Sequence, residues 1–121
     1  MRILIVEDDP FFQKFYTTKV AEAGYDVALA INGKEGLEKM VSWKPNMVLL
    51  DLIMPVLDGF EVLKRRQVDP ILKAIPVLIF STLGQDEERT EAKNLGANGY
   101  VHKGMTDFTQ TVQVIRQVLG Q

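Results

Sequence analysis

The sequence predicts an α/β fold, with a doubly wound five-stranded parallel sheet flanked by five helices. Five short apolar runs recur along the 121 residues, and each is separated from the next by a segment with helical spacing of its apolar residues. Alternation of this kind is typical of βα units. The expected strands are Ile3–Val6, Val27–Ala30, Met47–Leu50, Val77–Phe80 and Gly99–Val101.

Three of these runs are expected to lie in the middle of the sheet. The runs that begin at Ile3, Met47 and Val77 are apolar at consecutive positions rather than at every second one. Parallel strands that are covered by helices on both faces have this pattern. For a five-stranded sheet the flavodoxin-like order 2-1-3-4-5 is the common arrangement, and it places the carboxyl ends of the first and third strands side by side.

Signals at the helix ends predict where the helices lie. Asp9 before Pro10 reads as an N-cap and a first-turn proline, and the apolar stripe that follows stops at Gly24. Asp58, with Glu61 three residues on, resembles a capping box. Three more helices are expected at about 34–42, 86–95 and 107–119, with Gly96 as a stop signal and Thr106 as a cap.

Composition narrows the classes of function. Hydrophobic residues make up 46% and charged residues 25% of the chain, which fits one globular domain over residues 1–121. A net charge of −2, without a surplus of lysine and arginine, argues against direct binding of nucleic acid. The absence of cysteine excludes disulfides and thiolate metal sites. No stretch approaches the ~20 apolar residues of a membrane span, so a cytoplasmic protein is expected.

Polar side chains follow the predicted strands. Glu7 and Asp8 follow the first strand, Asp51 ends the third, Ser81 ends the fourth and Lys103 comes just after the fifth. Ligand sites in such sheets lie at the carboxyl ends of the strands. Two carboxylates from neighbouring strands would repel each other unless a cation lies between them. A hard divalent ion, Mg²⁺ or Mn²⁺, is therefore the expected cofactor.

This arrangement suits phosphoryl transfer to a carboxylate. Asp51 is the better placed nucleophile, because it stands alone at the end of a central strand and aspartyl phosphates are an established type of covalent intermediate. Lys103 would supply positive charge to the phosphoryl oxygens, and Ser81 could donate a hydrogen bond to the same group.

Four separated motifs resemble those of response-regulator receiver domains of the stand-alone chemotaxis type. They are Ile3 to Pro10, Leu50 to Pro55 with Asp58-Gly59, Pro76 to Thr82, and Gly96 to Lys103. The resemblance spans the whole chain. It implies that Glu7 and Asp8 are the acidic pair at the metal, that Asp51 is the phosphorylated residue and that the main-chain carbonyl of Ile53 is a further metal ligand.

The same resemblance implies a switch and its partners. Ser81 would be the switch hydroxyl, Tyr100 the aromatic residue that turns inward after it, and Lys103 the partner of the phosphate. The phosphoryl group would come from a histidine kinase or a phosphotransfer protein. A downstream protein target would then read the surface around the fourth helix, fifth strand and fifth helix. The protein would be a monomer or a phosphorylation-dependent dimer, and would not be a turnover enzyme.

Two departures from the family pattern carry predictions of their own. Gly104 stands where the family has proline after the lysine, so a trans peptide bond and a more mobile loop over residues 103–106 are expected. Ile53 and Leu83 are apolar where relatives often carry polar groups that guide the hydrolytic water, which predicts slow self-dephosphorylation.

Other functions remain open at this point. A Mg²⁺-dependent phosphohydrolase of related fold would commonly carry a second aspartate two residues after the nucleophile, where this chain has Ile53. A scaffold of receiver shape that is never phosphorylated is the third possibility, and Gly104 is the feature that makes it conceivable.

Several conspicuous residues have simpler structural explanations. Asp9 and Asp58 are interpreted as helix caps rather than ligands. Tyr100 could equally be a packed strand residue, and His102, the lone histidine, is assigned no role. The run from Lys64 to Arg66 is interpreted as a solvated helix face.

Overall fold

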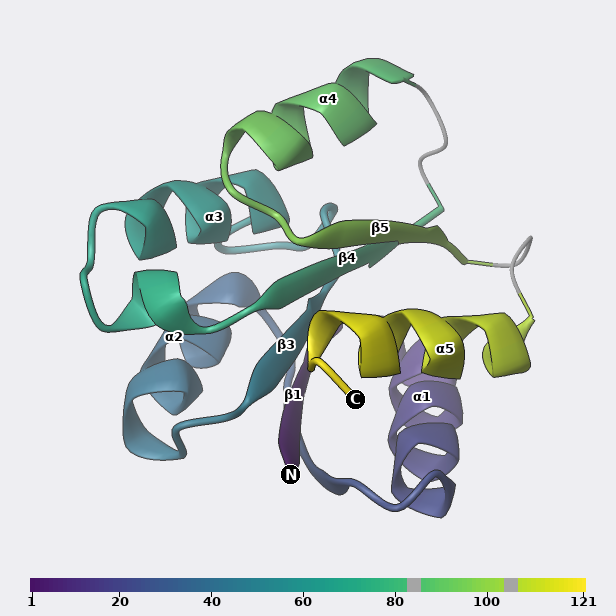
Figure 1. Cartoon of the computed structure of the whole chain (residues 1–121). Coiled ribbons are helices and arrows are strands. Elements are labelled where there is room, and N and C mark those ends of the chain that lie inside the picture. Colours follow the sequence, from purple (N-terminus) through teal and green to yellow (C-terminus); the bar gives the residue numbers. More distant parts are fainter. Residues whose placement is uncertain (83–85, 104–106) are drawn as a thin grey trace.

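The five predicted strands form one parallel sheet in the order β2-β1-β3-β4-β5, as expected (Figure 1). The structure is a computed structural model that describes residues 1–82, 86–103 and 107–121. The strands are β1 (Arg2–Val6), β2 (Asp26–Ala30), β3 (Met47–Leu50), β4 (Val77–Ser81) and β5 (Gly99–His102). The inner strands β1, β3 and β4 are the three with consecutive apolar residues.

Helices cover both faces of the sheet (Figure 1). They are α1 (Pro10–Glu22), α2 (Gly33–Ser42), α3 (Gly59–Gln67), α4 (Asp86–Asn94) and α5 (Phe108–Val118), with a short 3₁₀ helix at Leu72–Ala74. One core lies under α1 and α5, and the other lies under α2, α3 and α4. Strand β1 serves both cores, because Ile3 and Ile5 face the first whereas Leu4 and Val6 face the second. None of the helices in the described part of the chain is long and apolar enough to cross a bilayer.

The helix caps agree with the sequence at two helices and differ at a third. The carboxylate of Asp9 accepts hydrogen bonds from the first backbone amides of α1, and that of Asp58 accepts one from the amide of Glu61 at 2.9 Å. The prediction of Thr106 as the cap of the last helix was wrong. Asp107 caps α5 by accepting from the amide of Gln110 at 3.0 Å, and Thr106 itself lies outside the described residues.

Gly59 allows the first turn of α3 to pack directly on the end of β3. A Cβ atom at this position would lie 2.3 Å from the carbonyl oxygen of Asp51 and 2.8 Å from the Cα atom of Leu52. The amide of Gly59 donates to the carbonyl of Leu52 at 2.9 Å. Contact this close leaves no room for a side chain, so glycine fixes how the chain turns after Asp51.

Arg66 corrects the interpretation of residues 64–66 as a solvated helix face, because its side chain is buried. Its guanidinium donates hydrogen bonds to the carbonyls of Lys73, Ile75 and Gly96 at 3.2, 2.9 and 3.3 Å, and approaches the side-chain oxygen of Asn98 at 3.4 Å. These groups precede β4 and β5, so the arginine joins α3 to the amino ends of both strands. Burial lowers the pKa of Arg66 from its usual value.

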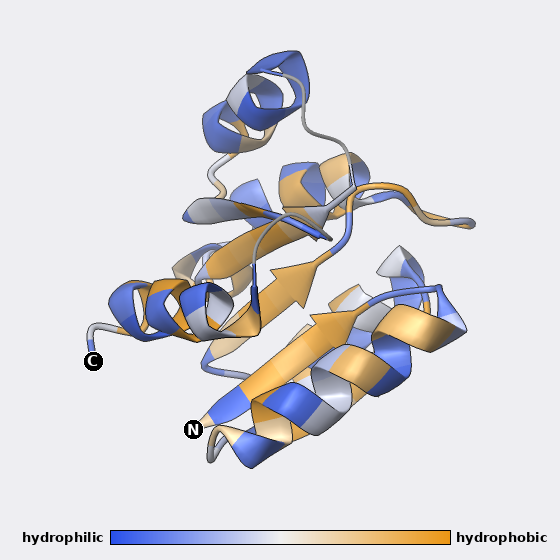
Figure 2. Cartoon of the chain, turned by 90° about the vertical axis from the view of Figure 1, so that its right-hand side faces the viewer, coloured by the Kyte–Doolittle hydropathy of each residue, from blue (hydrophilic) through white to orange (hydrophobic). Residues whose placement is uncertain are grey.

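Helix α4 contributes little to the core. Among the described residues of this helix, Ala92 is the one that is buried. The ribbon of α4 is almost entirely hydrophilic, in contrast to the apolar strands beneath it (Figure 2). The helix therefore packs on the rest of the fold through a narrow apolar contact.

Candidate functional site

The register of the strands brings four predicted residues to one edge of the sheet. Val6 pairs with Leu50 and Ser81 pairs with His102, so Glu7 and Asp51 follow one pair and Lys103 follows the other. Backbone hydrogen bonds extend past the strand ends. The amide of Asp51 donates to Val6, and the amide of Lys103 donates to Ser81. The site therefore lies on backbone that is hydrogen-bonded between neighbouring strands.

Three carboxylates converge at this edge. Glu7 is fully buried, Asp51 is 6% exposed, and Asp8 is partly exposed. One oxygen from each of the three lies within 4.8 Å of the other two. The expected approach of Asp8 and Asp51 is thus confirmed, and Glu7 lies within the same 4.8 Å limit of both.

Lys103 is the counter-charge to these acids. Its side chain is 3% exposed, and its Nζ lies 2.6 Å from Oε1 of Glu7 and 3.5 Å from Oδ2 of Asp51. The same ammonium group stands over the rings of Phe12 and Phe80, 4.4 and 4.7 Å from their centroids. Aromatic faces attract a cation in such contacts. The lysine is therefore held close to Asp51 from several sides.

The pKa of Glu7 reflects its burial first and the neighbouring negative charge second. Burial raises the pKa of Glu7 to about 8, and the nearby Asp51 acts in the same direction. Lys103 acts in the opposite direction and offsets only part of this effect. Oε2 of Glu7 is buried and has no hydrogen-bond partner among the described residues. A buried oxygen without a partner is costly, and a cation ligated by it would remove that cost.

These observations fit a hard divalent cation. Oxygen atoms from three carboxylates are the donor type that Mg²⁺ and Mn²⁺ prefer. Glu7, Asp8 and Asp51 are the residues that would hold the ion. Ile53 borders the same cavity of about 370 Å³, so its predicted ligation through the carbonyl remains compatible with the fold.

The affinity for Mg²⁺ is expected to rise with pH up to about pH 8. The pKa of Glu7, raised to about 8, means that most Glu7 side chains carry a proton at pH 7 when no ion is bound. An ion that binds the carboxylate must displace this proton, so binding at pH 7 should release close to one proton. Calorimetry in buffers of different ionisation enthalpy would measure the release. Glu7→Gln is the control that should abolish the proton release. An affinity for Mg²⁺ that does not change between pH 6 and pH 8.5 would contradict the prediction.

Ser81 and Tyr100 lie next to each other beside this site. Ser81 is fully buried at the end of β4, and Tyr100 is half-buried on β5. Burial raises the pKa of Tyr100, and a hydrogen bond with the Ser81 side chain lowers it in part. The Tyr100 hydroxyl is also close enough to Asp51 to respond to its charge. The predicted switch pair is thus physically connected to the acidic site.

Sequence reasoning missed some residues around the site. Phe12, Phe80 and Thr82 were not singled out, although Thr82 lines the cavity and the two rings flank Lys103. The position of Phe12 in the first turn after the acids was a usable signal. The predictions that concern Leu83 and Gly104 fall on residues outside the described part of the chain.

A family model for the response regulator receiver domain matches residues 3–116. The chain belongs to the response regulator receiver family. Receivers of this family act in two-component systems, and the fold of the present receiver is the flavodoxin-like one of its solved relatives.

Known receivers resemble this one along nearly its whole length. It is 37% identical over 118 residues to the DNA-binding dual master transcriptional regulator RpaA of Synechocystis, and spans about half (48%) of that protein. It is 35% identical to PilH of Pseudomonas aeruginosa, with 98% of both chains covered. The structure of chemotaxis protein CheY4 of Vibrio cholerae matches with a TM-score of 0.89 at 27% identity, covering 97% of each chain.

Proposed function

We propose that this receiver takes a phosphoryl group onto Asp51 from a histidine kinase or a phosphotransfer protein, with Mg²⁺ held by Glu7, Asp8, Asp51 and the carbonyl of Ile53. The observation that carries the proposal is the buried Lys103 ammonium, 3.5 Å from Oδ2 of Asp51, at an edge where three carboxylates meet. Residues 1–121 would act as one domain, and the proposed location is the cytoplasm.

The chemistry at Asp51 follows from these charges. A carboxylate oxygen of Asp51 forms the new bond to phosphorus while the bond from phosphorus to the donor's histidine nitrogen breaks, and that nitrogen takes up a proton. Negative charge accumulates on the phosphoryl oxygens during transfer, and the Lys103 ammonium is in place to stabilise it. Bound Mg²⁺ would neutralise charge on the same oxygens.

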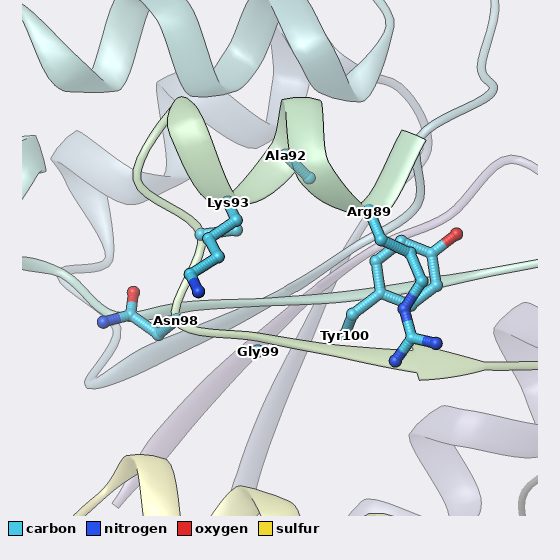
Figure 3. A pocket seen from close by; sticks show the side chains of 7 residues that line it. Arg89, Ala92, Lys93, Asn98, Gly99 and Tyr100 are labelled. Atoms are coloured by element: carbon cyan, nitrogen blue, oxygen red, sulfur yellow. The ribbon is translucent and has the colours of Figure 1, made fainter. Parts of the chain in front are cut away.

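The proposed output is a change in the surface formed by α4, β5 and α5. The hydrogen bond between Ser81 and Tyr100 supports this route, because a Ser81 hydroxyl drawn to a phosphoryl group on Asp51 can no longer hold Tyr100 as before. Tyr100 lies on β5 and faces α4, so its movement would alter that surface (Figure 3). A downstream protein target would bind one of the two states, and phosphorylation-dependent dimerisation is compatible with the same surface.

Incubation with acetyl phosphate and Mg²⁺, followed by intact mass measurement, tests the proposal. The expected result is a mass gain of one phosphoryl group. No gain is expected when EDTA is added before acetyl phosphate. Continuous release of free phosphate with turnover would instead indicate a phosphohydrolase. A chain that stays unmodified under conditions that label a known receiver would indicate a scaffold, and would overturn the proposal.

Self-dephosphorylation is expected to be slow. Ile53 lines the cavity beside Asp51 with an apolar side chain that cannot orient an attacking water. Ile53→Asn should shorten the lifetime of the phosphorylated state by about tenfold, because a positioned polar group assists the attack of water. The decay of the phosphorylated mass after removal of acetyl phosphate measures the rate. Ile53→Val, which stays apolar, is the matched control, and equal lifetimes for all three proteins would contradict the prediction.

A further inference from the structure

A basic pocket lies between α4 and β5, away from the acidic site. Its volume is about 300 Å³, and Arg89 and Lys93 on α4 face Asn98 and Tyr100 across it. Figure 3 shows both basic side chains projecting from the helix towards the strand, while the Tyr100 ring projects back towards the helix. The pocket is therefore formed by the same two elements whose surface the proposed function requires to change.

The positive charges of this pocket have no anionic partner among the described residues. Arg89 and Lys93 are one helical turn apart, both are exposed, and neither lies within 4 Å of a carboxylate in the described part of the chain. On other helices, Lys39 and Arg65 are each paired with a glutamate one turn away, Glu35 and Glu61 respectively. Like charges one turn apart destabilise a helix, so α4 bears a cost that a bound anion would relieve.

Arg89 is also oriented for recognition. Its guanidinium carbon lies 5.0 Å from the centroid of the Tyr100 ring, which restricts the side chain to one side of the pocket. A guanidinium held in this way can form two parallel hydrogen bonds to a carboxylate. Arginine and tyrosine are also the residue types that dominate binding energy at protein interfaces.

We propose that this pocket binds an acidic segment of a protein target, with a carboxylate side chain seated between Arg89 and Lys93. The inference rests on the proposed function and deepens it by naming the chemistry of the target. Charge favours a peptide over a nucleic acid. The other face of α4 carries Asp86, Glu87 and Glu91, which border a separate hollow and would repel a phosphate backbone that passed over the helix.

Binding at this pocket would depend on the state of Asp51. Tyr100 forms one wall of the pocket, and its side chain is hydrogen-bonded to Ser81 next to the acceptor. A shift of Tyr100 changes both the width of the pocket and the support of Arg89. The acidic segment must then have different affinities for the phosphorylated and unphosphorylated receiver.

Selection from a random-dodecapeptide display library tests the inference. The library is selected on the whole receiver, with and without acetyl phosphate and Mg²⁺, while intact mass reports phosphorylation separately. The expected result is a family of peptides rich in aspartate and glutamate, whose synthetic members perturb the NMR signals of Arg89, Lys93 and Tyr100. Double substitution Arg89→Gln and Lys93→Gln should weaken their binding by at least about tenfold.

The control for this experiment removes two positive charges from helices other than α4. Lys34→Gln with Lys64→Gln alters two exposed lysines on α2 and α3 and should leave peptide binding unchanged. Enrichment of neutral or basic peptides, equal losses in both double variants, or no enriched family would overturn the inference. Preference for an oligonucleotide or for a second copy of the receiver at these residues would overturn it as well. A failure of phosphorylation would appear in the mass measurement alone and would bear on the proposed function.

Discussion

Asp51→Asn is expected to abolish phosphoryl uptake completely. The amide that replaces the carboxylate has no negative charge and is not a nucleophile towards phosphorus. Glu7, the other carboxylate in contact with Lys103, is fully buried and cannot take over as the acceptor. The variant should fold, because asparagine preserves the shape of the side chain and removes one of the charges that face Glu7. Intact mass after incubation with acetyl phosphate and Mg²⁺ should show no gain.

Asp9→Asn is the matched control for this variant. It changes a carboxylate to an amide in the same cavity, but Asp9 caps α1 by accepting from the amide of Phe11 at 2.8 Å, and asparagine caps helices equally well. Uptake should therefore persist. A phosphoryl gain in Asp51→Asn that equals that of the unchanged protein would place the acceptor elsewhere and would refute the assignment of Asp51.

Arg66→Met is expected to lower the free energy of unfolding by about 3 kcal/mol. The change removes the donors to three main-chain carbonyls, and a buried polar group without a partner costs roughly 1 to 3 kcal/mol. Part of this loss is offset because the arginine no longer has to be desolvated, which is the cause of its lowered pKa. Urea denaturation followed by circular dichroism measures the change.

Arg65→Met is the control that separates the effect of losing buried hydrogen bonds from the effect of losing a positive charge. Arg65 is the neighbouring residue on α3, it is exposed, and it forms an ion pair with Glu61 at 3.3 Å. Exposed pairs contribute at most about 1 kcal/mol, so this variant should lose much less stability. Equal losses for the two variants would show that the buried contacts of Arg66 do not stabilise the fold in the way described.

Strand order and site location could be predicted because they depend on patterns that tertiary contacts do not override. Consecutive apolar residues mark strands buried on both faces, and the ends of such strands must meet at one edge. The acids and Lys103 were found from their position after strands. Their mutual distances, and the raised pKa of Glu7, could not be predicted, because they depend on burial that only packing creates.

Arg66 and Thr106 show where local patterns mislead. Arg66 follows two other basic residues, yet it lies four positions after Val62 and three after Leu63, on the buried side of α3. The helical spacing of Arg66 from these two apolar residues indicated that its side chain is buried. The basic residues before it, Lys64 and Arg65, suggested an exposed face instead. At α5, Thr106 and Asp107 are both acceptable caps, and one residue of difference is within the usual uncertainty of a helix boundary.

The narrow apolar contact of α4 limits the free energy that would be needed to change the orientation of this helix. A helix that buries Ala92 and little else has few packing interactions to lose when it tilts. Two orientations of such a helix can differ by only a few kcal/mol, so both can be populated before any ligand binds. A single charge-assisted hydrogen bond, worth roughly 1.5 to 3 kcal/mol, would then change their ratio by roughly tenfold to a hundredfold. In this receiver, the sparse packing of one helix is what would make a small chemical event at Asp51 large in its effect.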